Sequence, residues 1–220
     1  MSLTIGHYLC NKCPCFKTKT NSFNTMFNFF YKKAAQAINF FSLKNNGEIN
    51  KLRVLKLVYF ADRYHLRKYG RPITNDQYWA MKFGPVASGV KDLFELDSVS
   101  HEERHYSVKF FKPGTKEHTV LSIAPVENDV FSQSDLEALE FAWQTFGHNT
   151  QIVEITHAYP EWQRHAASIE GGSTRVPMDY LDFLDDPPRG INPCYVLSEE
   201  EREARREQLK DMNNIAVLWR

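Results

Sequence analysis

The chain has 220 residues, of which 42% are hydrophobic and 14% aromatic. This length and apolar content are enough to bury one sizeable core, so we expect one compact domain. Lys plus Arg and Asp plus Glu both number 27. A chain without net charge has no overall field that would attract nucleic acid, anionic lipid or an acidic substrate, and such binding would need a local patch.

The sequence predicts neither a membrane span nor a secretory signal. No apolar stretch approaches the ~20 residues that cross a bilayer, and His7, Cys10 and Lys12 interrupt any hydrophobic run near the N-terminus. Three of the four cysteines lie within residues 10–15, which differs from the distributed cysteine framework of a disulfide-stapled secreted domain. We therefore expect a cytoplasmic protein.

Residues 1–25 are polar and show no helical or strand period, so we interpret them as a loosely ordered leader. Soft and imidazole ligands at short spacing could hold zinc or iron there. These candidate ligands are His7, Cys10, Cys13 and Cys15. The alternatives are that the segment is disordered, or that translation begins at Met26. Residues 26–196 are expected to form the folded domain, and residues 197–220 a charged terminal helix.

The first half of the domain is predicted to be mainly helical. Apolar residues at helical spacing indicate a helix over residues 26–43. The next segment, residues 48–69, is apolar on most sides, as expected for a buried helix at the centre of a domain. A short extended piece follows around residues 77–82. Gly84 and Pro85 are then predicted to cap and open a new helix that ends near Leu96.

A β-hairpin is expected next, because apolar residues alternate with polar ones at 106–110 and a Pro-Gly pair precedes a second strand over residues 118–123. Ser134 and Glu137 have capping-box spacing ahead of a helix over residues 134–146. Asn149 or Thr150 is predicted to cap a shorter helix that reaches His157.

The terminal helix is predicted to open with another capping box, formed by Ser198 and Glu201. The expected fold is therefore mainly α with a small β-hairpin (α+β), a compact helical domain built around a buried central helix. A loop-rich stretch separates the shorter helices from the terminal one.

Two separated groups of residues resemble the Panacea domain of SocA-type antitoxins, a phage-associated family. The first group is residues 51–62 (Lys-Leu-Arg-Val-Leu-Lys-Leu-Val-Tyr-Phe-Ala-Asp), Pro72-Ile73, Trp79-Ala80 and Phe83-Gly84-Pro85-Val86. The second is Thr156-His157 and Pro160-Glu161-Trp162. The resemblance covers roughly residues 26–182, and two motifs in the same order argue against chance.

The resemblance implies an antitoxin that neutralises a co-encoded toxin by direct contact, with the core as scaffold and variable surfaces choosing the toxin. Some relatives are described as adaptors that deliver the partner to a protease. It implies no catalytic residue and no cofactor. The family-motif positions, which are the candidate partner-binding residues, are Lys56, Tyr59, Asp62, Trp79, Gly84, Pro85, His157 and Trp162.

Three features of these positions suggest chemistry or packing. Lys56 lies in an apolar run, so its ammonium must either snorkel to water or meet an acid from elsewhere. Tyr59, Asp62 and His65 are three residues apart on one helical face, where they could form a polar network or part of a binding groove. His157 and Trp162 bracket a proline, and core packing is the favoured interpretation.

Other functions remain as alternatives. Gly-rich phosphate loops, nucleophile elbows and paired-cysteine zinc frames are absent from the sequence. An enzyme of unrecognised class could still use Asp62, His65 or His157 as acid or base in a cleft beside Gly84. A nucleic-acid regulator that uses the basic leader is a third alternative, but Lys12, Lys17 and Lys19 alone give it a weak electrostatic basis.

The terminal helix offers a further possible contact surface. Leu209, Met212 and Trp219 could form an apolar stripe that docks a toxin or a second copy of the chain. The oligomeric state does not follow from the sequence.

Overall fold

The computed structural model describes residues 29–218, so the predicted leader with His7, Cys10, Cys13 and Cys15 lies outside the described residues. In chain order the elements are α1 (Tyr31–Lys44), β1 (Glu48–Asn50), α2 (Lys51–Tyr69), β2 (Tyr78–Met81), β3 (Gly84–Ala87), α3 (Ser88–Glu95), α4 (His101–Ser107), β4 (Phe111–Pro113), β5 (Thr119–Ser122), η1 (Asn128–Val130), α5 (Gln133–Phe146), α6 (Ile152–Thr156), α7 (Pro160–Gln163), α8 (Ala166–Glu170), β6 (Arg175–Pro177), η2 (Tyr180–Leu184) and α9 (Glu199–Leu218).

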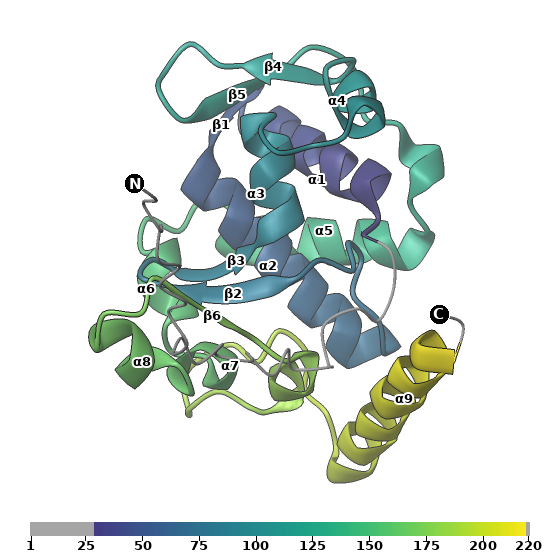
Figure 1. Ribbon diagram of the computed structural model, residues 1–220, viewed down its shortest axis with the longest axis vertical. Coiled ribbons are helices and arrows are strands. Elements are labelled where there is room, and N and C mark those ends of the chain that lie inside the picture. Colours follow the sequence, from purple (N-terminus) through teal and green to yellow (C-terminus); the bar gives the residue numbers. More distant parts are fainter. Residues whose placement is uncertain (1–28, 219–220) are drawn as a thin grey trace, which may run out of the picture.

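Helix α2 is the centre of the fold, as predicted. Every residue from Val54 to Arg67 is buried, and α1, α5 and β3 pack against it (Figure 1). The Asn50 side chain accepts a hydrogen bond from the backbone of the first turn and so caps the helix. Gly70, at φ 78°, ends it in the left-handed conformation. The helix begins at Lys51, three residues later than the pattern predicts, because residues Glu48–Asn50 form β1.

Two small antiparallel sheets flank the helices. The first has the strand order β1-β5-β4 and the second β3-β2-β6; Figure 1 shows the first at the top and the second left of centre. The β4–β5 pair is the predicted hairpin. The mainly α, α+β class is therefore confirmed, although the sheets contain more strands than the one hairpin expected.

The segment after the β2–β3 turn differs from its prediction. Gly84 and Pro85 do not open a helix but lie in β3, and α3 begins at Ser88. Pro85 is tolerated because β3 is an edge strand, which can lack a ladder donor. The helix start is capped from a distance, because the Asp76 carboxylate accepts the N–H groups of the two residues after Ser88 at 2.8 and 2.7 Å.

The predicted strand over residues 106–110 was also wrong. Ser100 and Glu103 form a capping box that starts α4, and Tyr106 belongs to this helix. Its ring packs edge to face against Tyr31 of α1, with centroids 5.8 Å apart. The strand β4 starts only at Phe111, because local capping and a contact with α1 outweigh the alternating pattern.

Two further caps differ from the sequence analysis. The box that opens α5 is formed by Ser132 and Asp135, rather than by Ser134 and Glu137. The short helix α6 has no side-chain hydrogen bond from its N-cap residue, Gln151. Both helices lie where the apolar spacing placed them, so the pattern located the elements better than it identified their caps.

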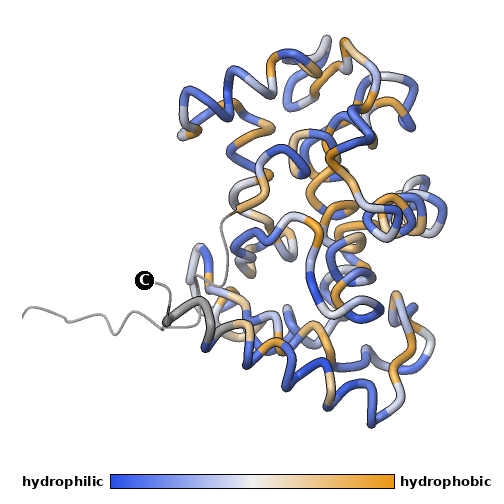
Figure 2. Tube along the Cα trace, turned by 90° about the vertical axis from the view of Figure 1, so that its right-hand side faces the viewer, coloured by the Kyte–Doolittle hydropathy of each residue, from blue (hydrophilic) through white to orange (hydrophobic). Residues whose placement is uncertain are grey.

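The terminal helix α9 opens with the predicted box, in which the Ser198 hydroxyl accepts the Glu201 N–H at 3.1 Å and the Glu201 carboxylate accepts the Ser198 N–H at 2.8 Å. Arg205 fixes the helix to the end of α2 by donating to the Lys68 carbonyl at 2.6 Å. Leu209 is fully buried, so it cannot belong to an exposed docking stripe, and Trp219 lies outside the described residues. Figure 2 shows that hydrophilic residues predominate along α9.

Candidate functional site where the two signature segments meet

The two signature segments, which are far apart in the sequence, meet beside the first half of α2. The Lys56 ammonium donates a hydrogen bond to the Pro85 carbonyl oxygen at 2.7 Å. Gly84, at φ 90°, lies so close to Thr156 that an added Cβ would be 2.3 Å from its hydroxyl oxygen and 3.0 Å from the Lys56 nitrogen. Only glycine combines this backbone conformation with this close approach.

Lys56 is fully buried and meets no acid, contrary to both outcomes that the sequence analysis allowed. Within residues 29–218 no carboxylate lies within ion-pairing distance of its ammonium group. The acceptor is instead a backbone carbonyl of β3, which is free because β3 is an edge strand of its sheet. Burial lowers the pKa of Lys56 to about 7, since the charged form loses its hydration.

His157 and Trp162 form a stacked pair next to this lysine. Their rings are 4.0 Å apart at an interplanar angle of 15°, and the indole N–H of Trp162 donates to the Met81 carbonyl at 3.0 Å. Burial, followed by the charge of Lys56, lowers the pKa of His157. The pair therefore packs the second signature against the end of β2, and the neutral imidazole is favoured in this position.

A second buried cluster forms around Glu161, to which the sequence analysis gave no role. One of its carboxylate oxygens accepts hydrogen bonds from the Tyr59 hydroxyl at 2.6 Å and from the Arg63 guanidinium at 2.7 Å. All three side chains are fully buried. The position of Glu161 inside the Pro160-Glu161-Trp162 motif was the signal that could have identified it as the partner of an arginine on α2.

Asp62 joins α2 to the segment that leads into β2. Its carboxylate accepts the Ile73 N–H at 2.7 Å, the Thr74 N–H at 3.1 Å and the Tyr78 hydroxyl at 2.9 Å. Burial raises the pKa of Asp62, and these donors oppose that effect. The carboxylate is therefore a fixed structural acceptor that sets the position of the β2–β3 hairpin relative to α2.

His65 makes a third, separate contact. Its Nδ1 lies 2.6 Å from the Arg71 carbonyl oxygen and its Nε2 lies 3.0 Å from the Ser134 hydroxyl. Burial lowers the pKa of His65 to about 4. A carbonyl can only accept, so the proton of the neutral ring is on Nδ1, and the Ser134 hydroxyl donates to Nε2.

Tyr59, Asp62 and His65 therefore share a helical face without sharing a network. The three side chains bind three different segments: the second signature, the approach to β2, and the start of α5. All three are buried, so they form no groove. The proposed acid or base pair of an enzyme cleft has no access to solvent at Asp62 or His65.

The tip of the β2–β3 hairpin carries the exposed part of the first signature. Phe83 is 54% exposed, with the Lys82 ammonium 5.7 Å from its ring centre. Four positions earlier, on β2, the Arg175 guanidinium lies 4.6 Å from the ring centre of half-buried Trp79. Aromatic rings with adjacent cations thus reach the surface directly beside the buried cluster.

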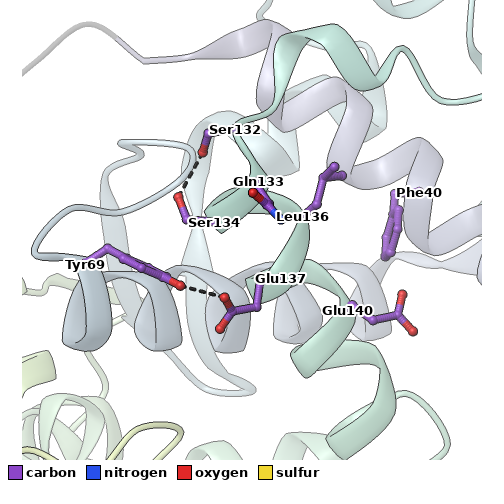
Figure 3. A pocket seen from close by; sticks show the side chains of 8 residues that line it. All are labelled: Phe40, Tyr69, Ser132, Gln133, Ser134, Leu136, Glu137 and Glu140. Atoms are coloured by element: carbon purple, nitrogen blue, oxygen red, sulfur yellow. Dashed lines mark hydrogen bonds between the residues drawn. The ribbon is translucent and has the colours of Figure 1, made fainter.

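An open groove of about 800 Å³ lies on a different part of the molecule (Figure 3). Its lining residues are Phe40, Tyr69, Ser132, Gln133, Ser134, Leu136, Glu137 and Glu140. None of the family-motif positions is among them. Hydrogen bonds from Lys68, Tyr64 and Tyr69 lower the pKa of Glu137 to about 2, so this carboxylate is ionised, but its charge is paired with Lys68 and its oxygens are occupied.

The described residues contain neither a metal-binding cluster nor a helix that could span a membrane. Across residues 29–218, no group of three or more His, Cys, Asp or Glu side chains could hold a metal ion. His157, Glu161 and His165 are spaced four residues apart, as metal ligands on one helix would be. They do not share one helix, since α6 ends before His157, and α7 contains Glu161 but ends before His165. In the same part of the chain, no helix has both the length and the apolar character needed to cross a membrane.

Comparison with protein-family models gives a match. The family model described as antitoxin SocA-like, Panacea domain, matches residues 54–163, which is half of the chain and extends from α2 to the end of α7. No curated protein and no solved structure matches the chain. The matched region contains Lys56, the β2–β3 hairpin and the His157–Trp162 pair, the same parts that converge in the structure. The chain therefore belongs to the SocA-like antitoxin family that is defined by the Panacea domain.

Proposed function

We propose that this chain is an antitoxin that neutralises a partner toxin by direct protein–protein contact. The family match carries the proposal. It is supported by the way in which the signature side chains are used, since Lys56, Tyr59 and Asp62 are buried and hydrogen-bonded to the backbone or side chains of other segments. Such residues build a scaffold, and a scaffold leaves recognition to the surface that it supports.

The contact surface that we propose includes the tip of the β2–β3 hairpin. Exposed aromatic side chains on rigid supports are typical of the energetically dominant positions of protein interfaces. Phe83 satisfies this description, because the strands that lead to it are tied to α2 through Asp62 and Lys56. The adjacent cations of Lys82 and Arg175 favour a toxin surface with apolar and acidic groups.

The toxin is proposed to be encoded next to this chain and to be met in the cytoplasm. We further propose that the bound toxin is then delivered to a protease, as the family resemblance implies. The test is co-expression of the chain with the adjacent open reading frame, with growth and co-purification as readouts. Rescue of growth together with a stable complex supports the proposal. A neighbour that is not toxic and does not bind would count against it.

A matched pair of variants tests the contact surface. Phe83→Ala removes the exposed ring at the hairpin tip, and Ile123→Ala removes a similarly exposed apolar side chain, 48% exposed, beside the other sheet. We expect Phe83→Ala to weaken the complex roughly 30-fold or more, which corresponds to about 2 kcal/mol. Ile123→Ala should leave the affinity unchanged. Equal affinities for both variants would place the contact elsewhere while leaving the antitoxin role intact.

No structural observation favours the alternative of an enzyme that uses Asp62, His65 and His157. Asp62 and His65 are fully buried and hydrogen-bonded, and they contact different segments. His157 is half-buried and stacked on Trp162. The three side chains therefore do not face a common cleft in which an acid and a base could act on one substrate.

A further inference from the structure

Helix α4 contains the sequence His101-Glu102-Glu103-Arg104-His105, a His-Glu-x-x-His spacing that the sequence analysis passed over. Two histidines four residues apart on a helix lie on the same face, one turn apart. This spacing places two imidazoles within reach of one metal ion, which is the reason that it recurs in zinc enzymes. The structure confirms that both histidines belong to one α-helix.

The helix that carries the two histidines is held firmly. A capping box between Ser100 and Glu103 satisfies its first turn. The Tyr31 hydroxyl of α1 donates to the Glu102 carboxylate at 2.6 Å, and the Gln36 amide of α1 donates to the Tyr106 hydroxyl at 3.1 Å. A short helix would fray if it were isolated, but these contacts fix its orientation and pre-organise the side chains that it presents.

The two imidazole rings are already aligned with each other. Their centroids are 6.1 Å apart and their planes differ by only 8°. Both residues are exposed, and within residues 29–218 neither ring takes part in a hydrogen bond or ion pair. Most of the other histidines in this part of the chain are packed or bonded, as His65 and His157 are. The ring nitrogens of His101 and His105 are therefore free to act as ligands.

The surroundings do not complete a metalloprotease centre. Across the described part of the chain no third His, Cys, Asp or Glu joins the pair as a ligand. In the enzymes that use this spacing, the glutamate acts as general base. Here the Glu102 carboxylate accepts a hydrogen bond from the Tyr31 hydroxyl, and the Glu103 carboxylate accepts one from the Ser100 N–H of the capping box. The pair can supply two ligands, and the other coordination positions would be filled by water or by a group of another molecule.

We propose that His101 and His105 form a binding site for a divalent transition-metal ion of the zinc, nickel or copper class. Neutral imidazole nitrogens suit these ions at about 2.0–2.1 Å, whereas magnesium and calcium prefer oxygen ligands. The site is on α4, which lies within the matched residues 54–163 but contains none of the family-motif positions. It is a property of this chain that does not depend on the antitoxin role.

The test is isothermal titration calorimetry, in which zinc chloride is titrated into the full-length chain and the number of bound zinc ions is measured. Wild type is compared with His101→Ala and His105→Ala. Each variant should lose one equivalent of bound zinc. The leader cysteines are candidate zinc ligands by sequence, so the series is repeated in a background with Cys10, Cys13 and Cys15 changed to serine. His148→Ala, which removes an exposed histidine on another helix end, is the matched control and should bind as wild type does.

Two further arms identify the ligands. Binding should weaken strongly when the pH falls from about 7.5 to about 5, because only a neutral imidazole can ligate a metal. Magnesium should give no saturable heat. Zinc stoichiometry that is the same in wild type, His101→Ala and His105→Ala would overturn the proposal. Both substitutions are at exposed positions, and far-UV circular dichroism verifies that the variants are folded.

Discussion

Two buried cations on α2, two turns apart, are accommodated in opposite ways. Arg63 meets the Glu161 carboxylate at 2.7 Å and also donates to the carbonyls of Pro193 and Asp185 at 2.6 and 2.7 Å. Among the described residues 29–218, Lys56 has one hydrogen-bond acceptor, the carbonyl of Pro85. The guanidinium has several donors in a fixed fork and stays charged, whereas the ammonium can lose its proton. Arg63 and Glu161 therefore form an ion pair that persists, whereas the Lys56 ammonium can lose its proton near neutral pH.

This difference shows that burial alone does not determine the state of a charged side chain. Both residues are fully buried, and both belong to the central helix α2. The carboxylate opposite Arg63 keeps the charge favourable, but no such group in the described residues faces Lys56. Burial consequently lowers the pKa of Lys56 to about 7. Four predictions test this comparison, from the largest expected effect to the smallest.

Glu161→Gln should give the largest loss of stability. The change keeps the shape of the side chain but removes the charge that compensates Arg63, and breaking a buried pair costs about 3–5 kcal/mol. Urea unfolding measures this loss as a lower free energy of unfolding. Glu154→Gln, at an exposed position of α6, is the control and should change stability by less than about 0.5 kcal/mol. Similar values for the two variants would contradict a structural ion pair.

Gly84→Ala tests the close approach of β3 to Lys56 and Thr156. The added Cβ would be 2.3 Å from the Thr156 hydroxyl oxygen, so the variant should lose roughly 1–3 kcal/mol beyond backbone strain. Gly172→Ala is the matched control, because Gly172 also has a positive φ, of 100°, but nothing lies within 4 Å of an added Cβ. The difference between the two unfolding free energies isolates the steric contact. Equal unfolding free energies for the two variants would mean that β3 and Thr156 can move apart at little cost.

Lys56→Met should remove a pH dependence of stability. The folded-state pKa is about 7, whereas an unfolded lysine titrates near ~10.4. Between these values the unfolded chain binds more protons, so the free energy of unfolding rises with pH, by up to ~1.4 kcal/mol per pH unit. Unfolding of wild type and Lys56→Met at about pH 7.5 and about pH 9.5 measures the slope. Lys112→Met, at an exposed lysine, should retain the wild-type slope.

Arg206→Gln at the terminal helix should have the smallest effect. Arg206 pairs with Asp185 at 2.8 Å, with both side chains partly exposed at 30% and 24%. Exposed ion pairs contribute about 0–1 kcal/mol and are screened by salt. Urea unfolding of this variant and of wild type, at low and at high ionic strength, should differ by less than about 1 kcal/mol. A loss as large as that of Glu161→Gln would show that α9 depends on this pair.

Several parts of the fold could be predicted because they depend on local pattern. The continuous apolar run over residues 54–61 led to the buried central helix, and the alternating and turn residues led to the β4–β5 hairpin, although its first strand was misplaced. The Ser198–Glu201 box was identified correctly because both partners lie within one turn. The start of α3 was missed because its cap, Asp76, comes from a preceding segment and not from the N-cap position.

The candidate site was predicted less well. The resemblance named segments that meet in the structure, but Lys56 was expected either to snorkel to water or to meet an acid, and Tyr59, Asp62 and His65 were considered as a polar network or as part of a groove. Each side chain instead bonds to a different part of the chain. Glu161 was quoted as part of a motif and left without a role, since nothing in the sequence placed it opposite Arg63.

By itself, the sequence determined the family, the helical class and the identity of the central helix, because these depend on spacing and composition along the chain. Only the tertiary structure decided that a carbonyl of an edge strand would face Lys56, that a carboxylate would face Arg63, and that Phe83 would remain at the surface. Hydrogen-bond partners are chosen by packing between distant segments, and a buried charge takes its pKa from those partners. The chemistry of the site therefore follows from which segments meet, and no local pattern contains that information.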